Sequence, residues 1–102
     1  MFVSIKGGSY ARFRRAIESG NLALIRGAAG ELPVVNLDDA LAILPVIASE
    51  EPERYERAAC RWLARLALER PVGLEEIRLA LAALDELPVR PAARSVLAGL
   101  AA

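Results

Sequence analysis

The chain has 102 residues, which is enough for one domain that folds without disulfides or metals. Thirteen basic residues balance thirteen acidic ones, so no overall field draws the protein to nucleic acid or to an anionic membrane. There is no histidine, and Cys60 is the single cysteine, which excludes Cys/His zinc sites, Ser-His or Cys-His nucleophiles and an internal disulfide framework. We therefore predict a non-enzymatic protein with no catalytic, cofactor-binding or metal-binding residues and no cofactor.

The compartment is predicted from two features of the chain. The N-terminal residues contain no apolar leader, and the longest uncharged internal run, Ala40 to Ser49, is about half as long as the ~20 residues of a membrane span. The lone cysteine fits a reducing compartment. We expect a cytoplasmic protein with no membrane association.

The first eight residues alternate like a short strand and end in two glycines. We predict a flexible N-terminal arm over residues 1–8 and a single all-helical domain over residues 9–102. Ser9 can cap a first helix from Tyr10 to Ser19, and Gly20 ends it.

Two asparagines mark the next two helix starts. Asn21 can cap a helix over residues 22–32, and Asn36, followed by two aspartates, starts another. Pro45 lies inside the apolar stripe of this later helix, where it predicts a kink or a break.

The segment between Pro52 and Pro71 has an uninterrupted helical pattern and is the predicted central helix, at about residues 53–70. Its apolar side consists of Tyr55, Ala59, Trp62, Leu63 and Leu66. The opposite side carries a row of basic residues, here called the arginine stripe: Arg54, Arg57, Arg61 and Arg65. Cys60 falls between the two sides, and we predict that it packs as a small hydrophobic residue.

Two further helices complete the expected fold. The first follows Gly73 and ends before Pro88, and the second covers residues 92–101. The apolar face predicted for the first consists of Leu74, Ile77, Ala80, Leu81 and Leu84. The predicted fold class is all-α: five to six antiparallel helices in a compact bundle or a short α–α stack, with Trp62 near the centre.

Two pairs of segments repeat a pattern. Residues 13–16 match residues 55–58, with an aromatic residue followed by a charged residue, arginine and alanine, and residues 32–40 match residues 71–77. In this respect the chain resembles helix-hairpin repeat proteins of the tetratricopeptide and HEAT types, and the resemblance implies an α-solenoid. It departs from them because the tetratricopeptide signature is not present in order. The alanine and arginine content is also similar to that of short helical proteins of actinobacteria, which implies a bacterial protein and no activity.

Apolar residues remain outside the predicted core faces. Leu68 falls within the arginine stripe, while Leu79 and Val46 point away from the core faces of their own helices. Apolar residues on a second side of successive helices indicate either further layers or a surface that a partner covers. We predict a protein–protein interaction or scaffold domain that binds either a protein partner or, as the favoured case, a second copy in a homodimer. The predicted surface consists of Arg54, Arg57, Arg61, Arg65, Leu68 and Leu79.

The alternative is a small nucleic-acid-binding or transcription accessory factor that uses the arginine stripe. The zero net charge, a possible ion pair between Glu53 and Arg57, and the lack of aromatic residues beside the stripe disfavour it. The carboxylate clusters, at residues 38–39, 50–53 and 75–76, each lie at a predicted helix start, where the helix dipole accounts for them.

Overall fold

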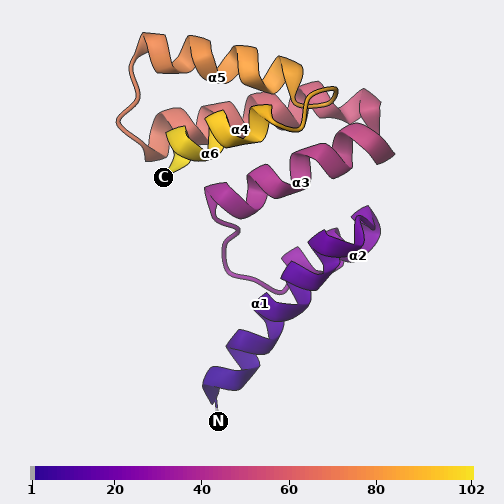
Figure 1. The fold of residues 1–102 in the computed structure, drawn as a ribbon. Coiled ribbons are helices and arrows are strands. Elements are labelled where there is room, and N and C mark those ends of the chain that lie inside the picture. The colour runs from indigo at the N-terminus through magenta and orange to yellow at the C-terminus, as the bar shows by residue number, and fades with distance from the viewer. Residues whose placement is uncertain (1) are drawn as a thin grey trace. The chain divides into compact units, whose positions relative to one another are not determined.

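The structure is a computed structural model that describes the backbone of residues 2–102 and the side chains of residues 8–102. Within that range the regular structure is entirely helical and contains no strand, as predicted. The described residues form six α-helices, labelled in Figure 1, and one 3₁₀ turn: α1 (Phe2–Ser19), α2 (Leu22–Ala29), α3 (Leu37–Glu50), η1 (Pro52–Arg54), α4 (Tyr55–Glu69), α5 (Leu74–Glu86) and α6 (Ala93–Ala101). The chain divides into two compact units, residues 1–35 and residues 36–102, and each is described by itself.

The first unit is a hairpin of α1 and α2, which contact each other. Gly20 joins the two helices with a φ of 70°, a left-handed conformation that favours glycine, so the predicted stop signal is confirmed. The predicted cap of α2 is also present, because the Asn21 side chain accepts a hydrogen bond from the Leu24 amide at 3.1 Å. An ion pair between Arg12 and Glu31 connects α1 to the segment after α2.

The first helix begins earlier than expected. Its backbone is helical from Phe2, so the predicted start at Tyr10 is wrong and Ser9 lies inside α1, where its hydroxyl accepts a hydrogen bond from Arg12. The flexible arm predicted over residues 1–8 falls largely on Met1 and on side chains 2–7, which lie outside the described part. Two glycines in a row suggested a helix break, but each costs only about 0.5–1 kcal/mol in a helix.

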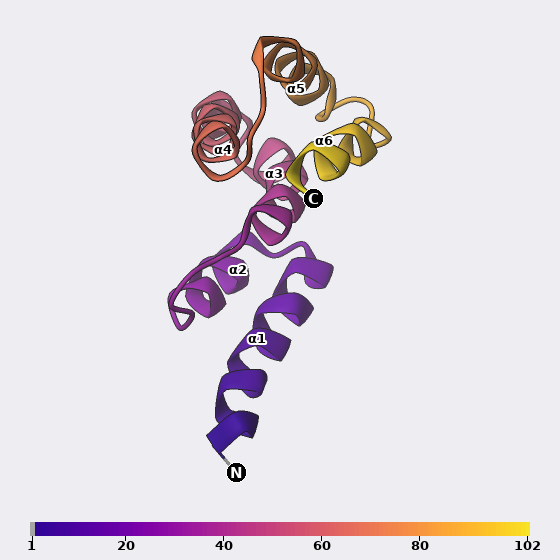
Figure 2. The same ribbon diagram turned by 90° about the vertical axis from the view of Figure 1, so that its left-hand side faces the viewer.

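The second unit is an antiparallel four-helix bundle. Helix α3 contacts α4, α4 contacts α5, α5 contacts α6, and α6 returns to α3, so the four helices close a ring. Figure 1 shows that successive helices run in opposite directions, and the end-on view of Figure 2 shows the four around a common centre. The expected antiparallel bundle is confirmed in this unit.

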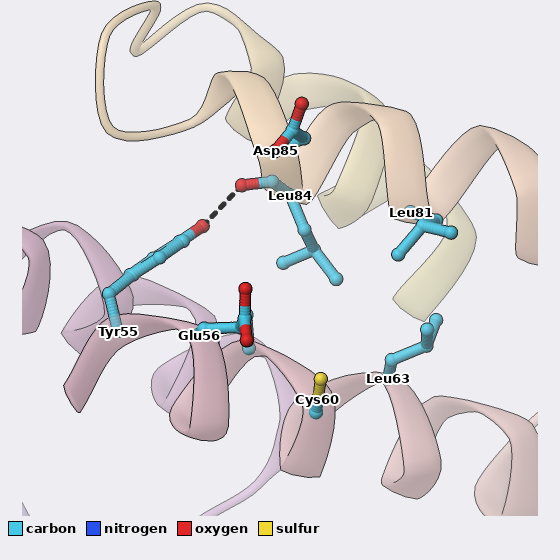
Figure 3. A pocket seen from close by; sticks show the side chains of 8 residues that line it. Tyr55, Glu56, Cys60, Leu63, Leu81, Leu84 and Asp85 are labelled. Atoms are coloured by element: carbon cyan, nitrogen blue, oxygen red, sulfur yellow. Dashed lines mark hydrogen bonds between the residues drawn. The ribbon is translucent and has the colours of Figure 1, made fainter. Parts of the chain in front are cut away.

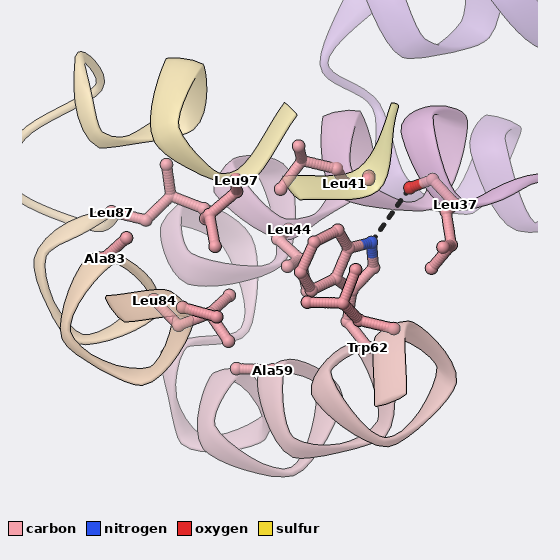
Figure 4. Packing of buried hydrophobic residues seen from close by; sticks show 12 residues of the cluster. Leu37, Leu41, Leu44, Ala59, Trp62, Ala83, Leu84, Leu87 and Leu97 are labelled. Atoms are coloured by element: carbon pink, nitrogen blue, oxygen red, sulfur yellow. Dashed lines mark hydrogen bonds between the residues drawn. The ribbon is translucent and has the colours of Figure 1, made fainter. Parts of the chain in front are cut away.

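The ring encloses one core, and Trp62 lies in it as predicted, with only 2 % of its surface exposed. Its indole Nε1 donates a hydrogen bond to the backbone carbonyl of Leu37 at 2.8 Å (Figure 4). The core residues come from all four helices: Leu37, Leu41, Leu44, Ala59, Trp62, Leu66, Ala80, Ala83, Leu84, Leu87, Leu97 and Ala101. All of them belong to residues 36–102, so this core is complete within the second unit.

The buried face of α5 differs from the prediction. Ala80 and Leu84 are buried as expected, but Leu74 and Leu81 are 77 % and 56 % exposed. The remaining core positions of this segment are Ala83 and Leu87, which lie three and seven residues after Ala80. A face that packs through alanines gives a weak hydrophobic signal in the sequence, which explains the misassignment.

Helix starts in this unit use the residues that the sequence indicated. The Asn36 side chain accepts a hydrogen bond from the Asp39 amide at 2.8 Å, and Glu76 Oε1 accepts one from the Gly73 amide at 2.9 Å. Helix α3 continues through Pro45 to Glu50, so the predicted break does not occur. Directly after α4, Arg70 Nε donates a hydrogen bond to the carbonyl of Ala101 at 2.8 Å and fastens α6 to the end of α4.

The internal sequence match does not fall on equivalent elements. Residues 13–16 lie in the middle of α1, whereas residues 55–58 begin α4. Between the two matched segments of the first copy lie the end of α1 and all of α2, but between those of the second copy lies only α4. The resemblance to helix-hairpin repeats therefore remains a prediction that these helix bounds do not support.

Candidate interaction surfaces on helix α4

Helix α4 buries one face and exposes the other along its whole length. Ala59, Trp62 and Leu66 are buried in the core, and Tyr55 and Leu63 pack partly against it. Its flank facing α3 carries Arg61 and Arg65, and the flank facing α5 carries the residues of a second groove described below.

Two arginines of the arginine stripe, those at its ends, are paired. Arg54 lies 3.5 Å from a carboxylate oxygen of Glu51, and Arg65 Nε donates to Glu69 Oε2 at 2.8 Å. The hydrogen bond from Arg65 lowers the pKa of Glu69, an exposed carboxyl at the end of α4. These contacts are local, within one turn of helix, and contribute little to stability.

The two central arginines are different. Arg57 and Arg61 are exposed, and neither forms an ion pair or hydrogen bond with any residue of the described range 8–102. The ion pair predicted between Glu53 and Arg57 is therefore not formed. Two adjacent guanidinium groups on one helix face are left for solvent or for a partner.

Leu68 continues this row. It follows Arg61 by seven residues, which is two helical turns on the same side and ~10 Å along the axis. Its side chain is 87 % exposed, the highest value among the large apolar residues of the described part. The predicted position of Leu68 within the arginine stripe agrees with this exposure.

Leu79 does not join this surface. It lies on α5 and is 50 % exposed, but the α5 residues that face α4 across their groove are Leu81, Leu84 and Asp85. Arg61 and Arg65 of the arginine stripe line a groove on the opposite flank of α4, toward α3. The structure thus brings Arg57, Arg61, Arg65 and Leu68 together, and it leaves Leu79 on a separate face; Val46 on α3 is only half-buried.

A shallow groove of about 260 Å³ runs between α3 and α4. Its α3 wall is apolar, with Ile43 and Ile47, and its α4 wall includes the aliphatic stems of Arg61 and Arg65 beside Trp62. Apolar surface bordered by guanidinium groups is suited to an amphipathic segment that carries carboxylates.

A second groove, between α4 and α5, has a volume of about 210 Å³. It is lined by Tyr55, Glu56, Ala59, Cys60, Leu63, Leu81, Leu84 and Asp85, and it contains no basic side chain. Figure 3 shows the Glu56 carboxylate and the Cys60 sulfur directed from α4 toward α5, with Leu63 and Leu81 at the other end. We call it the acidic groove.

The acidic groove was not predicted from the sequence. The sequence pattern places Leu63 and Leu81 on core faces and predicts a packed Cys60, but the structure shows Cys60 exposed. The available signal was the spacing of Glu56, Cys60 and Leu63, which are four and then three residues apart and therefore share one face.

Tyr55 closes one end of this groove. Its hydroxyl donates a hydrogen bond to the carbonyl of Leu84 at 2.5 Å. Burial of the phenol, and secondarily the negative charge of Asp85, raise the pKa of Tyr55 from 10.0 to about 12. The side chain is therefore neutral at physiological pH, and it acts as a fixed hydrogen-bond donor between α4 and α5.

The described residues contain neither a cluster of metal-ligand side chains nor a helix that could span a membrane. No group of three or more His, Cys, Asp or Glu side chains among them could hold a metal ion. In the same part of the chain, no helix has the length and apolar character needed to cross a membrane.

Comparisons with known proteins found no relative. No protein-family model, curated protein or solved structure matches the chain.

Proposed function

We propose that the protein is a non-enzymatic interaction or scaffold domain of the cytoplasm that self-associates through the exposed side of α4. The observation that carries this proposal is the position of Leu68, 87 % exposed, on the same helix side as Arg57 and Arg61, which have no partner among the described residues. Arginine is enriched among the interface residues that dominate binding energy, and an exposed leucine beside two such arginines adds apolar area that association would bury.

Self-association is tested by light scattering coupled to size exclusion across a concentration series. We expect the mass to rise above the 10.9 kDa of one chain as concentration increases. The Leu68→Asp variant should remain monomeric, because a buried carboxylate without a partner is costly. A wild-type protein that stays monomeric up to about 1 mM, the affinity range of very weak complexes, would contradict self-association.

The matched control is Val89→Asp. Val89 is 79 % exposed and lies in the turn between α5 and α6, away from α4, so the substitution makes the same chemical change elsewhere. Its association should match that of the wild type. Leu79→Asp tests the remaining residue of the predicted surface, and we expect no effect because Leu79 lies on α5 and not on the exposed side of α4.

A second candidate, a nucleic-acid accessory factor, is favoured by one observation, the two unpaired guanidinium groups of Arg57 and Arg61. This function predicts binding to a labelled duplex that weakens steeply with salt, with a smaller slope in the Arg57→Ala/Arg61→Ala variant. Binding that does not depend on salt concentration would rule this candidate out. The absence of any binding at about 50 mM salt would also rule it out.

A further inference from the structure

We propose that the acidic groove of one copy receives the exposed side of α4 of a second copy, so that the protein associates head to tail. The inference rests on the self-association proposed above and names the two surfaces that meet. The donor surface, here called the basic ridge, consists of Arg57, Arg61 and Leu68. The receiving surface is the acidic groove between α4 and α5.

The basic ridge is not complementary to itself. In a two-fold pairing each ridge would meet an identical ridge, so Arg57 and Arg61 of both copies would share one contact to which the ridge contributes no carboxylate, and like charges in contact are repulsive. The ridge therefore needs an acidic, apolar counterpart. Glu50, Glu53 and Glu56 follow one another on α3 to α4, but only Glu56 borders an apolar groove.

The acidic groove supplies that counterpart. Glu56 and Asp85 form no ion pair or hydrogen bond with other residues in the described part of the chain, and Leu81 beside them is 56 % exposed. Two uncompensated carboxylates and an apolar floor match two uncompensated guanidinium groups and a leucine. Both surfaces are present on every copy, and the chain as a whole has no net charge.

The order of groups along each surface also matches. The acidic groove is polar at the end with Glu56 and Asp85 and apolar at the end with Leu63 and Leu81 (Figure 3). Leu63 follows Glu56 by seven residues, just as Leu68 follows Arg61 by seven. Both separations are ~10 Å on a helix, so a ridge can place Arg61 near Glu56 while Leu68 reaches the apolar end.

The two surfaces lie on different sides of α4, because Cys60 and Arg61 are consecutive residues that diverge by about 100°. One copy can therefore bind one neighbour with its ridge and another with its groove. This is a heterologous contact, which produces a ring if the rotation closes and an open chain if it does not.

The deciding experiment mixes two variants that each lose one surface. Leu68→Asp disables the basic ridge, and Leu81→Glu disables the apolar end of the acidic groove; both residues are more than half exposed, so we expect both variants to fold. Each variant alone should associate about tenfold or more weakly than the wild type. Each should therefore be monomeric at concentrations where the wild type associates. The 1:1 mixture retains one intact ridge and one intact groove, so it should form a heterodimer and nothing larger.

A mixture that stays monomeric overturns the head-to-tail assignment, and so does a Leu81→Glu variant that associates like the wild type. These failures differ from failure of the proposed function. If the wild type associates and Leu68→Asp abolishes it while Leu81→Glu does not, self-association through the ridge stands and only the groove is wrong. Thermal unfolding of each variant by circular dichroism confirms that lost association is not lost folding.

Cys60 provides a second readout, because its exposed thiol lines the acidic groove. A copy seated in the groove covers the thiol, so its reaction with a maleimide should slow as protein concentration rises. The Leu68→Asp variant should show no such slowing. A labelling rate that is independent of concentration in an associating wild type would place the contact elsewhere and overturn the proposal.

Discussion

The indole nitrogen of Trp62 donates a hydrogen bond to the carbonyl oxygen of Leu37, 2.8 Å away and out of contact with water. This contact joins the middle of α4 to the first residue of α3 across the core of the bundle. We expect Trp62→Phe to lower the free energy of unfolding by about 2 kcal/mol, from the lost hydrogen bond and the space left by the smaller ring. Urea unfolding followed by circular dichroism measures this free energy. A decrease below about 0.5 kcal/mol, which is the size expected for a surface substitution, would contradict the prediction.

The pKa of Tyr55 makes stability depend on alkaline pH. Because burial raises this pKa from 10.0 to about 12, the unfolded chain ionises at a lower pH than the folded one. The stabilising contribution is fully present below pH 10 and is lost as the pH rises from about 10 to 12. The urea concentration at the unfolding midpoint, measured between pH 10 and about 12, should fall less steeply with pH in Tyr55→Phe than in the wild type.

The alanines of α5 should resist enlargement. Ala80 is fully buried in the core, whereas Ala82 on the same helix is exposed. Ala80→Leu should destabilise the bundle by about 1–3 kcal/mol because the added atoms have no space, while Ala82→Leu should change stability by less than about 0.5 kcal/mol. Chemical unfolding of the two variants gives the comparison, and equal effects would show that α5 packs differently.

Residues 36–102 should fold as a separate fragment. They hold the whole core cluster and begin with Asn36, whose side chain caps α3. We expect a cooperative urea transition with blue-shifted Trp62 fluorescence before unfolding. Residues 1–35 alone form only two helices, and they should show weak helicity because so short a chain buries little apolar surface. A fragment 36–102 without a cooperative transition would show that its core depends on the first unit.

Local signals in the sequence predicted the end of α1 and the starts of α2 and α3, but not the start of α1. Gly20, Asn21 and Asn36 act by short-range geometry, within three residues, so the chain reveals them without knowledge of the fold. The buried position of Trp62 was predicted for a similar reason, since it lies at the centre of a long apolar stripe.

Packing between helices was harder to predict from the sequence than the helix ends. Leucine dominates any hydrophobic pattern, so Leu74 and Leu81 appeared to belong to the core, while Ala83 contributed no signal. Exposure of Cys60 depends on how α5 lies over α4, which no pattern within α4 contains. Of the candidate surface, the row formed by Arg57, Arg61 and Leu68 could be found from helical spacing alone, whereas the acidic groove requires two helices and could not.

The closed ring of the bundle has a consequence for how fast it forms. Three of its four helix contacts join neighbours in the chain, and only α3 with α6 joins distant segments. Such a topology needs one long loop closure, so the search for the native arrangement is mostly local. We expect the bundle to refold within milliseconds or faster, with the meeting of α6 and α3 as the last event.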